Sequence, residues 1–362
     1  MRLRIGPART AGGRWLSVLT IGLLATATAC GSSGDDGGGG GGGAAGTLRL
    51  GYFPNVTHAV PVVGVAKGVY AKHLGSTKLE TQTFNAGPAE VEALLAGNLD
   101  AGYIGPNPAI NAYVKSKGKA IRIIAGATSG GASLVVRPGI DSAAALKGKR
   151  IASPQLGNTQ DVALRSYLKA NGLTPSSQGV EGDVQVEPTD NATTLTLFQQ
   201  GKLDGAWVPE PWATRLVLDG GGTVLVDEKT LWPGGRFVTT HLIVRTEFLE
   251  KYPDTVKALL QGQVETVDRI TANEADAKTT VNAELKRITT KALKTEVLDK
   301  AWQNIEITND PVASSLKKSA DDAVAAGLLS KVDLKGIYDL RLLREVLAGK
   351  GGGIDDAGLA AG

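Results

Sequence analysis

A short pattern occurs twice in this sequence, and the repeat constrains the fold more than any other feature. Residues 97–108 read GNLDAGYIGPNP, and residues 201–212 read GKLDGAWVPEPW. Equivalent positions hold the same or similar residues: Gly97 and Gly201, Leu99 and Leu203, Asp100 and Asp204, Tyr103 and Trp207. In each copy a glycine marks a helix end, and an aromatic-bearing strand leads into a proline-rich turn. The repeat favours two similar halves, although the same helix–turn–strand pattern can also arise twice independently.

The sequence around both copies alternates between strand-like and helix-like segments. Strands are expected at residues 47–52, 79–84, 100–105, 121–127, 150–153, 184–188, 205–209 and 223–227. Helices are expected at residues 59–71, 87–97, 109–117, 159–172 and 191–201, followed by amphipathic helices within 252–273, 294–307 and 310–327. This alternation predicts an α/β fold with mostly parallel, doubly wound sheets. Because such sheets bind ligands outside the carboxyl ends of their strands, GPNP (105–108) and VPEPW (208–212) are expected to face one cleft.

Length and charge narrow the class of protein. A chain of 362 residues favours two lobes over one small core. Residues 1–29 carry Arg2, Arg4, Arg9 and Arg14 and no acidic residue. Without these four arginines the 39 basic residues fall to 35 against 36 acidic ones, so the formal charge changes from +3 to −1. A nearly neutral mature chain gives no electrostatic reason to expect nucleic-acid binding.

The N-terminus has the features of an export signal. Arginines precede an apolar run at residues 15–29, which is short for a membrane span and suits the hydrophobic region of a signal peptide. Cys30, the single cysteine, follows ATA as in the lipobox of bacterial lipoproteins, with Ala27 where leucine is usual. Residues 31–46 read as a glycine-rich flexible tether. We predict lipidation at Cys30 and anchoring to the outer face of the cytoplasmic membrane; an ordinary secreted protein is the alternative.

Several segments of the body resemble the substrate-binding proteins of bacterial ABC importers, in the branch that handles nitrate, taurine, aliphatic sulfonates and thiamine-precursor pyrimidines. They are GYFPNVTHA, FNAGPAEVEALLAGNLDAGYIGPNPAI, GATSGGASLVV, SPQLGNTQD and WVPEPWATRL. The resemblance spans roughly residues 47–345 and looks closest to the aliphatic-sulfonate-binding group. It implies a two-lobed type II periplasmic-binding-protein fold with two crossover strands, near 132–138 and 239–245.

The resemblance also implies a domain organisation. We expect a signal peptide (1–29), the lipidated cysteine and tether (30–46), the N-terminal part of lobe I (47–133), lobe II (134–238), the C-terminal part of lobe I with further helices (239–350) and a flexible tail (351–362). The expected partners are the permease and ATPase subunits of an importer and, through the N-terminal lipid, the membrane. The protein itself is expected to be a monomer.

The strongest physical candidate for anion binding is LGNTQD at residues 156–161. Asn158 can cap a helix there, which leaves backbone N–H groups and the positive end of the helix dipole for an oxyanion, although a plain N-cap gives the same pattern. The resemblance favours a ligand site. The expected ligand contacts are Phe53, Asn55, Thr57, His58, Gly105, Pro106, Asn107, Thr128, Ser129, Gly130, Gly157, Asn158, Thr159, Gln160, Trp207, Glu210, Trp212 and His241.

Several of these residues allow other interpretations. Glu210 would repel an oxyanion, so we expect it to meet a ligand amine, as taurine has, or to accept hydrogen bonds from the ligand or the opposite lobe. Trp207 and Trp212 would wall an apolar ligand tail, although an aromatic residue in a strand also suits the core. His58, His241 and Glu210 are residue types that zinc accepts, but they show no helical or hairpin ligand spacing. We predict no metal and no cofactor.

The sequence predicts a solute receptor rather than an enzyme, because it contains no nucleophile motif, P-loop or dinucleotide-binding glycine fingerprint. The predicted function is to bind a small organic oxyanion, an aliphatic sulfonate or a taurine-like compound, and to deliver it to a permease. Nitrate and a thiamine-precursor pyrimidine are the alternative ligands. An enzyme on the same fold is the alternative activity, and the export signal argues against it because such biosynthetic work needs cytoplasmic substrates.

Overall fold

The computed structural model describes residues 43–176, 180–330, 332–350 and 353–360. The body from Gly42 to Gly362 is one compact unit. Cys30, the predicted signal peptide and most of the predicted tether lie outside the described residues. Among the residues that are described, no helix combines the length and the apolar character that crossing a bilayer requires.

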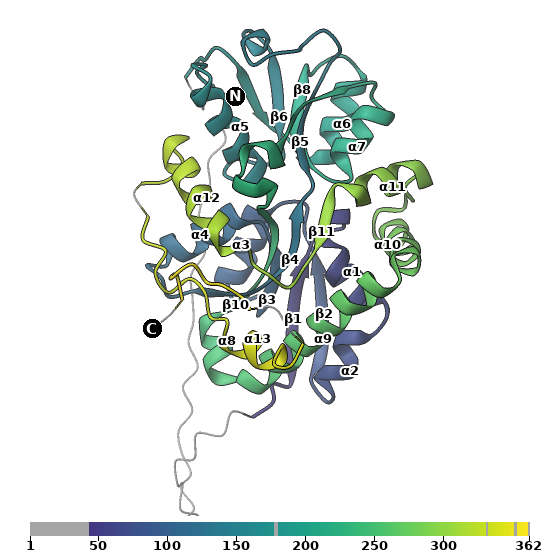
Figure 1. Ribbon diagram of the computed structural model, residues 1–362, viewed down its shortest axis with the longest axis vertical. Coiled ribbons are helices and arrows are strands. Elements are labelled where there is room, and N and C mark those ends of the chain that lie inside the picture. Colours follow the sequence, from purple (N-terminus) through teal and green to yellow (C-terminus); the bar gives the residue numbers. More distant parts are fainter. Residues whose placement is uncertain (1–42, 177–179, 331, 351–352, 361–362) are drawn as a thin grey trace, which may run out of the picture. The chain divides into compact units, whose positions relative to one another are not determined.

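Lobe I is built on a six-stranded sheet with the strand order β11–β4–β10–β3–β1–β2 (Figure 1). Its strands are β1 (Thr47–Tyr52), β2 (Lys78–Thr83), β3 (Ala101–Ile104), β4 (Ile121–Gly130), β10 (Val238–Arg245) and β11 (Ile305–Ile307). Its helices are α1 (Ala59–Ala66), α2 (Val69–Leu74), α3 (Gly87–Leu95), α4 (Pro106–Lys115), α8 (Thr246–Lys251), α9 (Pro253–Ala272), α10 (Glu274–Thr289), α11 (Thr295–Gln303), α12 (Ala313–Ala325) and α13 (Arg341–Val346).

Lobe II is built on a five-stranded sheet with the strand order β7–β6–β8–β5–β9. Its strands are β5 (Ala132–Val136), β6 (Arg150–Ser153), β7 (Gln185–Pro188), β8 (Gly205–Pro209) and β9 (Thr223–Asp227). Its helices are α5 (Thr159–Ala170), α6 (Asn191–Gln199) and α7 (Trp212–Leu218). Four 3₁₀ turns complete the described elements: η1 (Val56–His58), η2 (Ala144–Leu146), η3 (Glu228–Leu231) and η4 (Pro233–Gly235).

The two sheets share one topology. The order β2–β1–β3–β10–β4 in lobe I corresponds to β7–β6–β8–β5–β9 in lobe II. In each sheet the first three strands pair in parallel, whereas β10 and β5 run antiparallel to both of their neighbours. Four strands of each sheet run in one direction, as expected of mostly parallel sheets, and both sheets are mixed because β10 and β11 in lobe I and β5 in lobe II run against them. The α/β class and the two-lobed fold are confirmed.

The antiparallel strands follow the points where the chain passes between the lobes. The chain leaves β4 and enters β5 through Gly130 and Gly131, both with φ of +76°, a backbone conformation that glycine adopts without strain. It returns from β9 to β10 through η3 and η4. The predicted crossover segments at 132–138 and 239–245 thus fall largely in β5 and β10, each of which belongs to one sheet.

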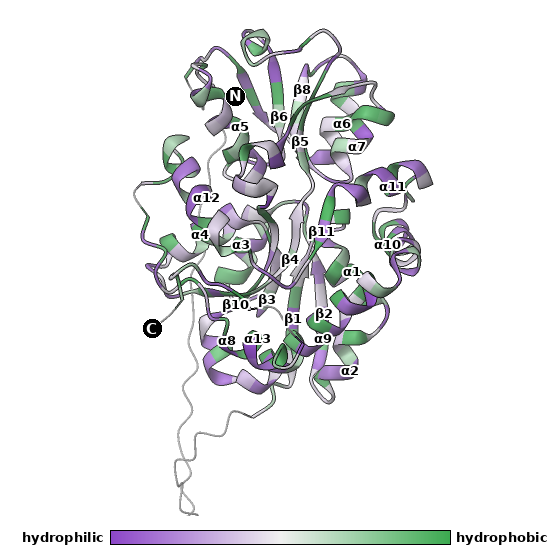
Figure 2. Cartoon of the chain, in the orientation of Figure 1, coloured by the Kyte–Doolittle hydropathy of each residue, from purple (hydrophilic) through white to green (hydrophobic). Residues whose placement is uncertain are grey.

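Buried apolar side chains hold each lobe together. One large cluster fills lobe I, and two smaller clusters cover opposite faces of the lobe II sheet. Figure 2 shows hydrophilic residues on the visible faces of α10 and α11, which lie at the outside of lobe I. The helix expected at 59–71 is interrupted: α1 ends at Ala66, and Gly68 with φ of +67° separates it from α2.

Candidate functional site

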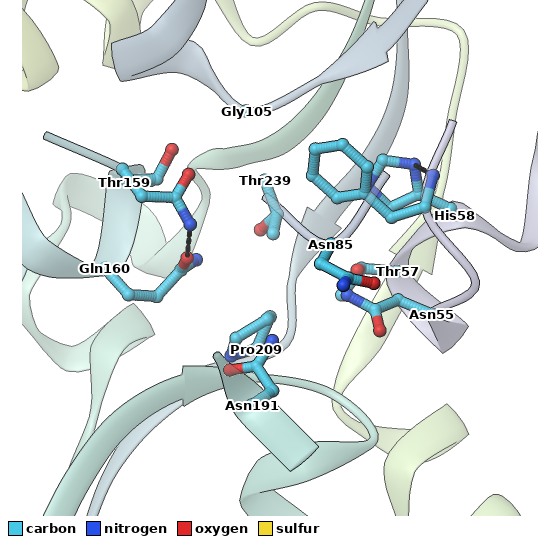
Figure 3. A pocket seen from close by; sticks show the side chains of 12 residues that line it. Asn55, Thr57, His58, Asn85, Gly105, Thr159, Gln160, Asn191, Pro209 and Thr239 are labelled. Atoms are coloured by element: carbon cyan, nitrogen blue, oxygen red, sulfur yellow. Dashed lines mark hydrogen bonds between the residues drawn. The ribbon is translucent and has the colours of Figure 1, made fainter. Parts of the chain in front are cut away.

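A cavity lies where the two lobes meet (Figure 3). Lobe I contributes Phe53, Asn55, Thr57, His58, Asn85, Gly105 and Thr239, and lobe II contributes Asn158, Thr159, Gln160, Asn191 and Pro209. The empty space between these residues is about 340 Å³ when its opening to solvent is counted. Eight of the lining residues were predicted from the sequence as ligand contacts: Phe53, Asn55, Thr57, His58, Gly105, Asn158, Thr159 and Gln160.

His58 presents a neutral ring with a defined tautomer. The backbone N–H of Phe53 donates to Nδ1 of His58 at 3.2 Å, so the ring proton of the neutral form is on Nε2. Burial lowers the pKa of His58 to about 3, which keeps the ring uncharged at physiological pH. In the described part of the chain Nε2 has no protein acceptor, and its N–H is available as a donor.

Asn55 links the cavity wall to lobe II. The indole N–H of Trp212 donates to Oδ1 of Asn55 at 3.0 Å. This contact leaves the amide NH₂ of Asn55 as its hydrogen-bonding group for a ligand. Trp212 does not itself line the cavity, so the structure places it as a partner of a lining residue and not as the predicted wall for an apolar tail.

The N-terminus of α5 forms the opposite wall. Asn158 occupies the N-cap position with extended backbone, and its side chain makes no capping hydrogen bond. Instead, Nδ2 of Asn158 lies 3.5 Å from Oε1 of Gln160, which leaves the NH₂ group of Gln160 free to donate. The first N–H groups of this 12-residue helix and its dipole add further positive character.

Charges close to this helix end are neutralised within lobe II. Asp161 is fully buried in the first turn of α5, and both of its carboxylate oxygens accept from Nε of Arg165 at 3.0 Å. Ser153 and the N–H of Gly157 also donate to Asp161, at 2.8 and 2.9 Å. Gly157 therefore serves this carboxylate and lies outside the lining. Because Asp161 is paired in this way, it does not cancel the donor character of the helix end.

Thr128 and its neighbours support the cavity from behind. Thr128 Oγ1 and Thr240 Oγ1 donate to the backbone oxygen of Thr57 at 2.7 and 3.0 Å, which fixes the turn that carries His58. Ser129 and Gly130 pair with β10 and β11 at the end of β4. These three predicted contacts lie outside the lining, because β4 continues past the residue where the strand was expected to end.

Four other predicted contacts make hydrogen bonds elsewhere or start a helix. Pro106 and Asn107 form the first turn of α4 beside a smaller neighbouring cavity, and Nδ2 of Asn107 donates to the backbone oxygen of Ser319 at 2.9 Å. Trp207 is fully buried and donates to Glu228 Oε2 at 2.7 Å. His241 Nε2 donates to the backbone oxygen of Pro311 at 3.0 Å, and burial lowers its pKa to about 4.

Glu210 is satisfied by protein donors. Its carboxylate accepts from the N–H and the hydroxyl of Thr214 at 3.1 and 3.0 Å and, across the lobes, from Nδ2 of Asn304 at 2.7 Å. Burial raises the pKa of Glu210. It lies outside the cavity lining, so of the roles predicted for it the contact with the opposite lobe is the one present. Within the described ranges, no group of three or more His, Cys, Asp and Glu residues has the arrangement of a metal site.

Four lining residues were missed by sequence reasoning: Asn85, Asn191, Pro209 and Thr239. Asn85 follows β2 at a predicted strand end, which is the signal that could have identified it. Pro209 occupies the same repeat position as Gly105, so the repeat itself pointed to it. Among the described residues that line the cavity there is no Asp, Glu, Lys or Arg, and amides, hydroxyls, one neutral imidazole and helix N–H groups make up its polar surface.

Comparisons with known proteins identify the family. Residues 42–283 match the model of the NMT1-like family. The chain is 29% identical over 218 residues to the taurine-binding periplasmic protein of Escherichia coli (strain K12). This alignment covers 60% of this chain and 65% of the E. coli protein. The alkanesulfonate-binding protein SsuA from Xanthomonas axonopodis pv. citri, bound to MOPS, has a TM-score of 0.67, 21% identity, and coverage of 80% of this chain and 96% of its own.

A third similar protein extends the range of ligands. The periplasmic nitrate-binding protein NrtA from Synechocystis PCC 6803 has a TM-score of 0.72 and 18% identity, with coverage of 84% of this chain and 88% of its own. At these identities the solved structures establish the fold alone, and that fold is the one expected from the sequence. The chain belongs to the NMT1-like family and has the fold of the periplasmic binding proteins.

Proposed function

We propose that this protein is the extracytoplasmic solute-binding subunit of an ABC importer and that it binds a small organic oxyanion, an aliphatic sulfonate or a taurine-like compound, between its lobes. The supporting observation is the cavity lining, which is rich in hydrogen-bond donors and carries no formal charge. Donors of this kind hold an oxyanion by directed hydrogen bonds and helix dipoles without a cationic side chain.

The relatives support the class of ligand. The names of the similar proteins above give taurine, alkanesulfonates and nitrate as their ligands. Taurine and alkanesulfonates carry a sulfonate group, and nitrate is itself an oxyanion. Nitrate is the second candidate ligand, because it presents the same oxygens without a tail. These relatives are named as binding proteins, which favours a receptor over the alternative of an enzyme on the same fold.

The predicted membrane attachment completes the proposal. A lipid on Cys30, followed by a glycine-rich tether, would hold the protein at the outer face of the cytoplasmic membrane, where a permease can meet the loaded receptor. We also propose the lobe boundaries at 133/134 and 238/239. The lobes close on the ligand, and the permease recognises the closed form.

The test is calorimetric titration of the secreted chain, residues 31–362, with taurine, ethanesulfonate, nitrate and a hydroxymethylpyrimidine, with mass spectrometry of the recovered ligand. We expect a sulfonate to bind unchanged, and the bound form to be stabilised against unfolding as ligand concentration rises. Binding of nitrate or pyrimidine alone, or chemical conversion of the ligand, would contradict the proposal.

His58→Phe sharpens the test. Phenylalanine keeps the ring that packs 4.3 Å from Phe53 but removes both the Nε2 donor and the Nδ1 acceptor of the Phe53 N–H, and we expect sulfonate affinity to fall about tenfold or more. His73→Phe is the matched control, since His73 contacts Glu265 on α9, far from the cavity lining. Because the pKa of His58 is about 3, affinity is expected to stay constant between pH 5.5 and 8.5.

A further inference from the structure

Helix α7 of lobe II lies against helix α11 of lobe I (Figure 1). Side chains connect the lobes at both ends of this pair of helices. Asn304, which follows α11, donates from Nδ2 to Oε1 of Glu210, which precedes α7, at 2.7 Å. Lys294, which precedes α11, donates from Nζ to Oδ1 of Asp219, which follows α7, at 2.7 Å. The two helices therefore run in opposite directions across the boundary between the lobes.

These two end contacts lie outside the cavity lining. Glu210 lies beside the first crossing between the lobes, because its N–H donates to the backbone oxygen of Gly131 at 2.9 Å. A contact at such a crossing moves little when the lobes separate. At the other end the side chain of Lys294 is 75% exposed, and an exposed ion pair contributes little to the closed form. The contact between the two ends differs from both, because it reaches the cavity.

Trp212 makes this middle contact. It is the first residue of α7, and the guanidinium carbon of Arg215 lies 4.8 Å from the centre of its ring. Its indole N–H donates to Oδ1 of Asn55 in lobe I at 3.0 Å. Asn55 lines the cavity and is 5% exposed, and among the described residues the indole N–H is the one hydrogen-bond partner of its side chain.

The hydrogen bond from Trp212 determines which group Asn55 offers to the cavity. A carboxamide can turn over and exchange the positions of its oxygen and its NH₂ group. Because Trp212 lies outside the lining and holds Oδ1, the NH₂ group is the part of the amide that remains for a ligand. Without the indole N–H both orientations are accessible, and the amide oxygen would repel an oxyanion.

We infer that Trp212 is a positioning residue, which in the closed form fixes the amide of Asn55 with its NH₂ group toward the ligand. Since Trp212 belongs to lobe II and Asn55 to lobe I, their hydrogen bond exists only while the lobes are together. This bond couples closure of the lobes to the contact with the ligand, so its loss speeds ligand release. The inference rests on the proposed function and adds a residue outside the lining that controls one of the donors within it.

The experiment is a double-mutant cycle on the secreted chain, residues 31–362, measured by calorimetric titration with ethanesulfonate, taurine and nitrate. Trp212→Phe keeps a ring beside Arg215 but removes the indole N–H, and we expect affinity to fall about tenfold, mainly through faster dissociation. Asn55→Ala removes the positioned amide and is expected to weaken binding at least as much. Adding Trp212→Phe to Asn55→Ala is expected to change affinity by less than about twofold, because Trp212 acts through Asn55.

Trp302→Phe is the matched control. Trp302 is a buried tryptophan of α11, and its ring lies 6.0 Å from Nζ of Lys278 within lobe I. This variant is expected to keep its affinity within about twofold of the unmodified protein. Unchanged affinity in Trp212→Phe, or losses that multiply in the double variant, would overturn the positioning role and leave the proposed function intact.

The three anions separate this inference from the proposed function. The cycle is run with each anion that the unmodified protein binds, because the NH₂ group of Asn55 serves the oxygens of a sulfonate and of nitrate alike. If nitrate alone binds and the cycle shows the expected coupling, the proposed sulfonate is rejected and the role of Trp212 stands. Failure of all three anions to bind the unmodified protein would reject both.

Discussion

The two copies of the repeat fold in the same way, down to individual backbone hydrogen bonds. In lobe I, Asp100 N–H donates to Arg49 O at 2.9 Å, and Arg49 N–H donates to the Asp100 carboxylate at 2.9 Å. In lobe II, Asp204 N–H donates to Arg150 O at 2.8 Å, and Arg150 N–H donates to the Asp204 carboxylate at 2.9 Å. Each aspartate thus joins the strand that follows it to a neighbouring parallel strand, β1 in lobe I and β6 in lobe II.

The same aspartates also bind the antiparallel strand of each sheet. Arg245 N–H at the end of β10 donates to Asp100 O at 2.8 Å, and Arg137 N–H after β5 donates to Asp204 O at 2.9 Å. The repeated residues therefore specify a set of hydrogen bonds around Asp100 and Asp204, called here the aspartate node, that holds three strands of each sheet in register. This explains why the pattern occurs twice: it belongs to the scaffold of each lobe.

The side chains around the two nodes differ. The guanidinium groups of Arg49 and Arg245 both reach the Asp100 carboxylate, at 2.6 and 3.3 Å. In lobe II the guanidinium of Arg150 turns instead to Glu187 at 2.7 Å. The aspartate therefore has the same backbone role in both lobes, and among the described residues only Asp100 in lobe I also forms ion pairs.

The first prediction uses this difference and has the largest expected effect. Asp100→Ala keeps the backbone–backbone bonds but removes the carboxylate that accepts from the Arg49 N–H and from two guanidinium groups, so we expect the free energy of unfolding to fall by about 3 kcal/mol. Asp204→Ala removes only the carboxylate that accepts from the Arg150 N–H and is expected to cost about 1 kcal/mol. Urea unfolding of the two variants measures both values. Equal losses would show that the ionic contacts of Asp100 add nothing to stability.

The second prediction compares the aromatic residues of the two copies. Tyr103 donates to the neutral amide of Gln263, whereas Trp207 donates to the carboxylate of Glu228. Burial raises the pKa of Glu228 to about 7 from an unfolded value near 4.5, against the opposing influence of Trp207, Trp232 and Lys318, while Asp322 raises it further. Only the aromatic residue of the lobe II copy, Trp207, therefore donates to a group that titrates near neutral pH.

The sign of the pH dependence follows from this shift. Between pH 4.5 and 7 the folded protein binds more protons at Glu228 than the unfolded chain, so this stabilisation is complete below 4.5 and is lost as the pH rises through about 7. Glu228→Gln keeps an acceptor for Trp207 and is expected to reduce the loss of unfolding free energy between pH 4.5 and 8 by about 2–3 kcal/mol. Glu90, whose pKa burial also raises, remains in both proteins and cancels in the difference. Parallel stability curves for the two proteins would contradict the assignment.

The elements that depend on local pattern could be predicted from the sequence. The segments expected at 150–153, 205–209 and 223–227 are β6, β8 and β9 with the same bounds, because each is a short apolar run between polar or glycine-containing turns. The direction of β5 and β10 could not be predicted, because it depends on where the chain crosses between lobes. No local pattern distinguishes an antiparallel central strand from a parallel one.

The candidate site was predictable where it depends on the ends of elements. His58 and Gln160 lie at the start of helical turns that follow a strand, and both line the cavity. Trp207 lies in the middle of β8, where helices cover both faces of the sheet, so its side chain points into the core beside Tyr167. Asn191 has the sequence context of a helix start, and its place in the cavity lining appears only when the two lobes are packed together.

The last prediction concerns the one place where equivalent positions of the repeat meet at the cavity. Gly105 and Pro209 occupy the same position in the two copies, and both line the space between the lobes. A Cβ on Gly105 would lie 2.3 Å from Oγ1 of Thr159, and 3.6 Å from the backbone oxygen of Thr239. Since the φ of Gly105 is −70°, alanine fits the backbone itself, and the conflict is confined to the contact with lobe II.

Gly105→Ala is therefore expected to weaken sulfonate binding about tenfold, by keeping Thr159 away from its place in the closed cavity, with less than about 1 kcal/mol of change in the free energy of unfolding. Pro209→Ala, at the matching position of lobe II, removes atoms from the wall and is expected to weaken binding by less than about threefold. Titration calorimetry and urea unfolding on both variants separate the two quantities. If Gly105→Ala lowered stability and left affinity unchanged, the close approach of Gly105 to Thr159 would belong to the scaffold, like the aspartate node, and not to the site.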